Sequence, residues 1–117
     1  MNKRVEAFNM LQDDPIGALR KYDASGFSWE REFLDVPSHM QVGFATYYLV
    51  GLPPGNFLQA VLDNDFLGIM SQADHINRTH LEEWARLMYN IPRVARDREA
   101  WVECEGMIGW EEKHGNA

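Results

Sequence analysis

The chain has 117 residues, 45% hydrophobic and 25% charged, which is typical of one globular domain near the most common domain length. Its formal net charge of −7 disfavours direct binding to nucleic-acid phosphates or to an anionic membrane. No apolar run approaches the roughly 20 residues of a membrane span, and the single cysteine, Cys104, excludes an intramolecular disulfide and favours a cytoplasmic location.

Two short helices are predicted at the N-terminus. Residues 3–12 carry a loose apolar face made by Val5, Ala7, Phe8, Met10 and Leu11. Asp14 is the predicted N-cap of the second helix, because Pro15 at the first helical position loses no hydrogen bond. We expect this helix to end near Gly26 and to turn Ile16, Leu19 and Tyr22 toward the core.

Two further helices are predicted before the Gly/Pro turn. Ser28 is the expected N-cap of the first, which Pro37 ends, and its apolar residues are Trp29, Phe33 and Val36. Ser38 and Gln41 have the spacing of a capping box that opens the second. That helix carries Met40, Phe44, Tyr47 and Tyr48 and ends at Gly51, an expected left-handed C-cap, since Pro53 prevents continuation. Because adjacent tyrosines on a helix cannot point in the same direction, one of Tyr47 and Tyr48 is expected at the surface.

A single helix is predicted after the turn at residues 53–56, with Asn56 as its N-cap. Apolar residues recur at increments of three and four and form one broad stripe: Leu58, Val61, Leu62, Phe66, Ile69 and Met70. Asp63 and Asn64 fall on the opposite face, with Asp65 at its border. The polar segment 73–78 is expected to break or bend the chain.

Two more helices complete the prediction. Thr79 and Glu82 form a second capping box, and Ile91 before Pro92 ends the helix that it opens, with Leu81, Trp84, Ala85, Met88 and Ile91 inward. The last helix covers 96–113, weakened by Gly106 and Gly109, with Ala100, Trp101, Cys104, Met107 and Ile108 inward. We found no strand-like alternation, so the sequence predicts an all-α, single compact domain, 1–117, of six or seven helices.

Residues that could bind a metal or perform catalysis lack the spacing that these roles require. The oxygens of residues 63–65 lie inside an apolar helical pattern and not in a calcium loop. No zinc spacing joins the candidate ligands His39, His75, His80 and Cys104. Cys104 lies on the apolar stripe of its helix and is predicted to be a buried small hydrophobe. We therefore expect no catalytic residue, no metal and no cofactor.

One aromatic and acidic surface is a candidate for partner binding. Trp110 follows the glycines of the last helix, and interface hot spots are enriched in tryptophan. The outer side of the same helix carries Glu103, Glu105, Glu111 and Glu112. These residues are predicted to form an acidic patch, centred on Trp110, for a basic partner. A solvated helix face is the alternative.

A motif runs from Tyr48 to Trp101. It reads Gly51-x-x-Pro54-Gly55-x-Phe57-Leu58-x-Ala60-Val61-Leu62-x-Asn64-Asp65, then Ala73-Asp74-x-x-Asn77-Arg78, then Tyr89-Asn90-x-Pro92. This pattern resembles that of a group of small proteins of unassigned activity encoded by tailed bacteriophages and prophages. The Trp-Gly-Ser associated with the end of that group is absent here.

The resemblance implies a source and no mechanism. It suggests that one linked polar cluster forms where two helices meet, composed of Asn64, Asp65, Asp74, Asn77 and Arg78. Asp74 and Arg78 also have the spacing of a helical ion pair. The cluster is expected either to lock the helix junction or to bind a ligand.

The function expected from these observations is that of a small acidic phage-encoded interaction protein. It would bind a host or phage protein in the bacterial cytosol and modulate or inhibit a host complex, in host takeover or against antiviral defence. Clustered carboxylates imitate phosphates, so a partner with a basic nucleic-acid-binding surface is one target. Two alternatives stay open: a protein that binds or sequesters a small ligand or nucleotide, and a homo-oligomeric structural or assembly protein.

Overall fold

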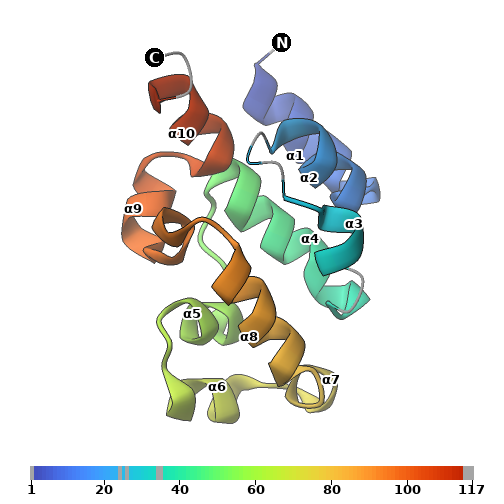
Figure 1. The fold of residues 1–117 in the computed structure, drawn as a ribbon, viewed down its shortest axis with the longest axis vertical. Coiled ribbons are helices and arrows are strands. Elements are labelled where there is room, and N and C mark those ends of the chain that lie inside the picture. The colour runs from blue at the N-terminus through green and yellow to red at the C-terminus, as the bar shows by residue number, and fades with distance from the viewer. Residues whose placement is uncertain (1, 24, 26, 34–35, 115–117) are drawn as a thin grey trace.

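The computed structural model describes residues 2–23, 25, 27–33 and 36–114, and across these residues the regular structure is helical, with no strand. The predicted all-α fold is confirmed (Figure 1). The first helices are α1 (Lys3–Asp13), α2 (Pro15–Tyr22), α3 (Trp29–Glu32) and α4 (Ser38–Ala45), the last continuing into the π-helical turn η1 (Thr46–Val50). They are followed by α5 (Asn56–Leu62), α6 (Phe66–Gln72), α7 (His75–Arg78), α8 (Leu81–Asn90), the 3₁₀ turn η2 (Arg93–Arg96), α9 (Arg98–Glu103) and α10 (Gly106–His114).

The rod formed by α4 and η1 is the centre of the upper part of the molecule (Figure 1). The N-terminal helices α1, α2 and α3 lie on one side of it, and α9 and α10 lie on the other. Both α1 and α10 contact η1, and α2 contacts α4. The remaining helices, α5 to α8, form the lower part of the molecule in this view.

The two tyrosines of η1 are both fully buried, so the prediction that one lies at the surface is wrong. The physical reason is that helices cover this rod on two sides, so two directions from it lead into the core. The Tyr47 hydroxyl donates to the carbonyl of Ala95 at 2.5 Å. The Tyr48 ring lies 5.0 Å from the ring of Trp29. The backbone carbonyl of Tyr48 accepts a 3.0 Å hydrogen bond from the Trp101 indole.

The end of η1 meets the start of α10 at two glycines. Gly51 has φ 73° and its N–H bonds to the carbonyl of Tyr47, which confirms the predicted left-handed C-cap. Gly106 has φ 74°, and a Cβ added there would lie 2.6 Å from the Leu49 carbonyl oxygen. A Cβ on Gly51 would lie 2.5 Å from the backbone nitrogen of Gly106. The crossing therefore requires both residues to lack a side chain.

The predicted N-cap of α2 is confirmed, but both capping boxes are wrong. Asp14 accepts from the backbone N–H of Gly17 at 2.9 Å. Ser38 is itself the first residue of α4, and the Gln41 amide donates instead to the carbonyl of Val36 at 3.1 Å. The Thr79 hydroxyl donates to the carbonyl of Ile76, because it closes the C-terminal turn of α7 and does not open α8.

Other helix starts also differ from the prediction. Ser28 occupies the N-cap position of α3 without a side-chain cap bond. Gly55, and not Asn56, is the N-cap of α5. The predicted helix end near residue 26 lies outside the described residues, and α3 ends at Glu32, before the expected stop at Pro37.

Two predicted long helices are divided and the polar segment 73–78 contains the short helix α7, so the structure has more segments than the six or seven expected. The helix expected from residue 56 is split at Asn64, which has φ 55°, and the last helix is split at Glu105, with φ 70°. A left-handed residue cannot continue a right-handed helix. Among residues predicted to face inward, Ala85 is exposed, and Ala100 and Cys104 are half-buried. No described helix combines the length and the apolar character needed to cross a membrane.

Candidate functional site

The break between α5 and α6 shapes the most distinctive surface of the molecule. Asp63 is the C-cap of α5, and left-handed Asn64 turns the chain. Asp65 is the N-cap of α6, where its carboxylate accepts from the backbone N–H of Gly68 at 3.1 Å. Because the chain turns here, the apolar stripe predicted for one straight helix is fully buried only as far as Leu62, and Ile69 beyond the turn is half-buried against the core.

Helix α6 has no fully buried residue, although most of the residues in its N-terminal half are apolar. Phe66 is 70% exposed and Leu67 77% exposed, and Met70 is also exposed. On the neighbouring helix α8, the Tyr89 ring is 82% exposed. Single exposed apolar residues are ordinary, but a group of large ones on adjacent elements marks an interaction surface.

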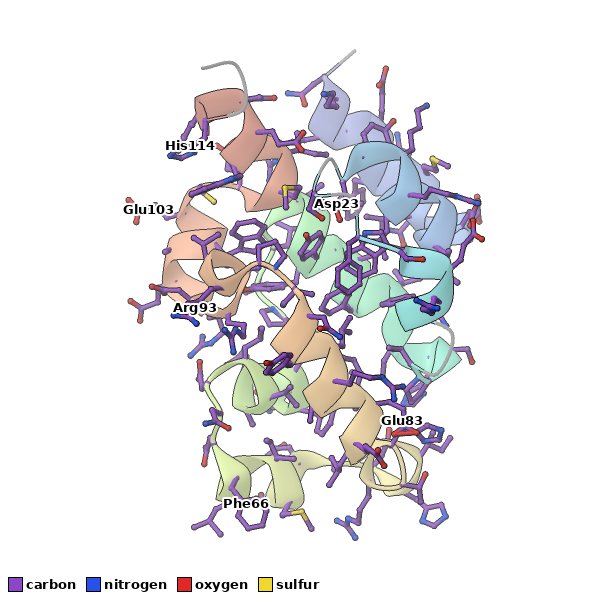
Figure 2. All side chains as sticks on the ribbon, in the orientation of Figure 1. Asp23, Phe66, Glu83, Arg93, Glu103 and His114 are labelled. Atoms are coloured by element: carbon purple, nitrogen blue, oxygen red, sulfur yellow. The ribbon has the colours of Figure 1, made fainter. Side chains whose placement is uncertain are left out.

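A groove of about 520 Å³ runs between α5, α6 and α8. Its walls are mainly apolar and aromatic, and its lining includes Leu62, Phe66, Ile69, Leu81, Trp84 and Met88. Tyr89, Arg93 and Arg96 line it as well. Figure 2 shows Phe66 and Arg93 on the same side of α8, at opposite ends of this region, with Glu83 on the other side of the helix. The volume falls within the usual range of about 300–1,000 Å³ for ligand pockets.

One end of the groove is basic. Arg93 and Arg96 are the first and last residues of η2, which directly follows α8 and Pro92. Arg93 is exposed, whereas the Nε of Arg96 is buried and has no hydrogen-bond partner among the described residues. A buried donor without an acceptor is unfavourable unless a partner supplies one. On a protein with a net charge of −7, this end of the groove is a local cationic site.

The predicted polar cluster contains residues with separate structural roles. Asp65 caps α6, whereas Asp74 caps α7 by accepting from the backbone N–H of Asn77 at 2.7 Å. Asn77 is buried, and its side-chain oxygen accepts a 3.1 Å hydrogen bond from the indole of Trp84. These bonds position the α6–α7–α8 corner beside the groove, and Asn64 itself lines the groove.

The charged members of that corner find partners outside the predicted pair. Asp74 contacts the Nε2 atom of His39 at 2.8 Å, which links α7 to α4. Arg78 donates to the carbonyls of Met70 and Ala73, so it closes the end of α6. The pKa of Asp74 is lowered chiefly by the hydrogen bond from the Asn77 backbone and next by His39.

The residues of the predicted acidic patch lie on α9, on α10 and, for Glu105, between the two helices; Figure 2 labels Glu103 beside α9 and His114 at the end of α10. Trp110 is half-buried, with its ring 6.3 Å from that of Trp101 and stacked on His114 at 3.8 Å. Glu103 and Glu112 are exposed, and Glu111 is half-buried. Glu105 pairs with Arg4 at 2.7 Å and so joins the junction between α9 and α10 to α1.

The candidate metal ligands are dispersed. Within the described part of the chain, no group of three or more His, Cys, Asp or Glu side chains could hold a metal ion. His39 contacts Asp74, and His80 contacts the carbonyl of Ile76. The Cys104 thiol donates to the carbonyl of Trp101 at 3.4 Å, and burial raises its pKa. A thiol with a raised pKa is a weak nucleophile at neutral pH.

The sequence does not predict the groove. Apolar periodicity places Phe66 in a core stripe, and it gives no role to the groove residues Tyr89, Arg93 and Arg96. The signal that could have revealed it is the run of residues 63–65, since three consecutive residues that favour caps and turns within an apolar pattern indicate a break.

Comparison of the chain with protein-family models, with curated proteins and with solved structures finds no match.

Proposed function

We propose that this chain is a small protein-interaction protein that docks a partner on the groove between α5, α6 and α8. The observation that carries the proposal is the exposure of Phe66, which lines the groove, on a helix that has no fully buried residue. In line with the resemblance to small phage proteins, the partner is a host or phage protein whose activity changes when the groove is filled.

The groove has the features of a protein-docking site. It has an aromatic floor and wall in Trp84 and Phe66, and Tyr89 stands exposed at its edge. Interface hot spots are enriched in such residues, and grooves of this kind accept the apolar face of a partner helix. Docking there would remove from water the apolar surface that Phe66 exposes to the groove, which is favourable in proportion to its area.

The acidic patch predicted around Trp110 is a second candidate surface for the same class of function. Its exposed members Glu103 and Glu112 are suited to a basic partner. Part of the Trp110 ring, however, already packs on Trp101 and His114. The groove therefore offers more unpartnered apolar surface than the patch.

A pull-down from bacterial lysate with paired variants tests the proposal. The first variant is Phe66→Ser, which removes the exposed side chain of α6 that lines the groove. The matched variant is Glu103→Ala with Glu112→Ala, which alters the patch. We expect wild type and the patch variant to retain the same stoichiometric partner and the α6 variant to lose it.

The thermal midpoint serves as the folding control. Because Phe66 is 70% exposed, we expect its replacement to leave the melting temperature within a few degrees of wild type. Loss of the partner from the patch variant alone would move the interaction to the acidic patch and refute the groove. Retention by both variants would refute both surfaces.

A further inference from the structure

We propose that the groove binds an amphipathic helical segment of the partner whose apolar face is followed by a carboxylate that Arg93 and Arg96 receive. This inference rests on the proposed function and names the chemistry of the partner segment. Three observations carry it: the apolar walls, the geometry of the two arginines and the sign of the charge around them.

The walls favour a helix as the occupant. The groove-lining residues of α8 are Leu81, Trp84, Ala85, Met88 and Tyr89, which recur at helical spacing along one side of that helix. A helix of ten residues is about 15 Å long, so the groove accommodates two to three turns of a partner helix. The partner's apolar residues would recur at i, i+3, i+4 and i+7.

The arginines form a fork for an anion. They are three residues apart in a 3₁₀ turn, and side chains at i and i+3 eclipse each other in this geometry. Both line the same groove, where Arg93 is exposed and Arg96 is half-buried. A guanidinium binds a carboxylate through two parallel hydrogen bonds, so a carboxylate is the acceptor that fits this end best.

The surrounding charge restricts the pattern further. The whole chain carries −7, so an occupant that is acidic throughout is repelled by the rest of the surface. A segment with carboxylates confined to one end meets the local cationic site and avoids that repulsion. Charge thus sets the direction in which the segment lies along α8, with its acidic end at η2.

Selection from a displayed library of random helical peptides tests this inference and requires no identified partner. Peptides enriched on the wild-type protein are synthesised, and their affinities are measured by calorimetry. The protein variants are Phe66→Ser for the apolar wall, Arg96→Gln for the fork, and Arg20→Gln as the control on distant α2. Each peptide is also made with its acidic residue replaced by the amide.

We expect enriched peptides to combine the apolar spacing with Asp or Glu at one end. Phe66→Ser should abolish binding, and Arg96→Gln should weaken it about tenfold or more, as loss of a charge-assisted hydrogen bond does. Arg20→Gln should have no effect. On the wild-type protein, the amide peptide should bind as weakly as the acidic peptide binds to the Arg96→Gln variant. The affinity of the amide peptide should fall little further on the Arg96→Gln variant, because the carboxylate that Arg96 would bind is already absent.

Peptides that depend on Phe66 but not on Arg96 or on their own carboxylate would overturn this inference and leave the proposed function standing. Enrichment of no peptide, or of peptides indifferent to both side chains, would overturn both. Sedimentation equilibrium of the protein alone completes the test. A dimer that Phe66→Ser dissociates would identify a second copy as the occupant and would overturn the inference of an acidic partner segment.

Discussion

The indole nitrogen of Trp84 donates a 3.1 Å hydrogen bond to the side-chain oxygen of Asn77 in the interior of the protein. Asn77 is 2% exposed and Trp84 1% exposed, so water cannot replace either partner. The bond joins the short helix α7 to α8. It therefore fixes the corner from which Trp84 forms a wall of the groove.

Asn77→Ala should destabilise the protein by about 1–3 kcal/mol, because it leaves a buried indole N–H without an acceptor. Urea denaturation followed by circular dichroism measures the change. If Asn77 is a structural lock, the folded variant should still bind the partner of the wild-type protein. Loss of binding with unchanged stability would instead assign Asn77 to a site.

The same bond can be isolated by a double-mutant cycle with Trp84→Phe. That variant removes the indole donor and keeps an aromatic ring against Phe57, whose ring lies 5.7 Å away. In the Trp84→Phe background, Asn77→Ala should cost about 1 kcal/mol less than in wild type. Additive effects of the two substitutions would show that the bond contributes nothing to stability.

The crossing of Gly51 and Gly106 makes a second prediction about stability. Gly106→Ala should destabilise the protein by more than about 1 kcal/mol, because it combines a left-handed φ of 74° with a backbone clash. Gly43→Ala is the matched control. It lies inside α4, a Cβ there meets nothing within 4 Å, and alanine should stabilise that helix by roughly 0.5–1 kcal/mol.

Thermal and urea unfolding of the two alanine variants measure these opposite shifts. A neutral Gly106→Ala would mean that the start of α10 moves away from η1 at little cost. The contact between the Leu49 carbonyl and Gly106 would then not be required for folding.

Much of the helical architecture follows from local sequence. Asp14 before Pro15, and Gly51 before Pro53, specify a start and a stop through backbone chemistry, and the structure has both. The breaks inside the predicted long helices are harder to see. Asn64 and Glu105 adopt left-handed backbone, and apolar periodicity continues across both positions.

The burial of Tyr47 and Tyr48 and the exposure of Phe66 share one cause. Local periodicity states which face of a helix is apolar, but it does not state how many neighbours surround the helix. The rod of α4 and η1 has neighbours on both sides, whereas α6 packs mainly on α5. The candidate groove depends on this long-range difference, and for that reason it could not be read from the spacing of apolar residues.

Acid titration should expose the role of Asp74 at the start of α7. Its folded-state pKa is lowered from the ordinary value of 3.8, chiefly by the hydrogen bond from Asn77 and then by His39. The unfolded chain therefore takes up a proton first as the pH falls, so this contribution to stability is present above about pH 4 and is lost as the pH falls through the folded-state pKa.

The stability difference between wild type and Asp74→Ala should thus be larger at about pH 6 than at about pH 3. Urea denaturation at both pH values measures it, and Asp13→Ala, at a position that caps no helix, is the control for loss of one carboxylate. An equal difference at both pH values would show that Asp74 acts only through side-chain packing or helix propensity.

Alkaline titration tests the burial of the paired tyrosines. Burial raises the pKa of both Tyr47 and Tyr48 above the ordinary value of 10.0, and for Tyr48 the nearby carboxylate of Asp23 raises it further. The unfolded chain loses these protons above about pH 10 while the folded chain keeps them, so the stability that they contribute is present below that pH and is lost as the pH rises.

Tyr48→Phe should therefore make the free energy of unfolding fall less steeply above about pH 10 than in wild type. Tyr89→Phe is the matched control because its ring is 82% exposed. The same alkaline slope in wild type and in Tyr48→Phe would contradict the burial of the Tyr48 hydroxyl, and with it the reason that neither tyrosine of η1 is accessible to a partner.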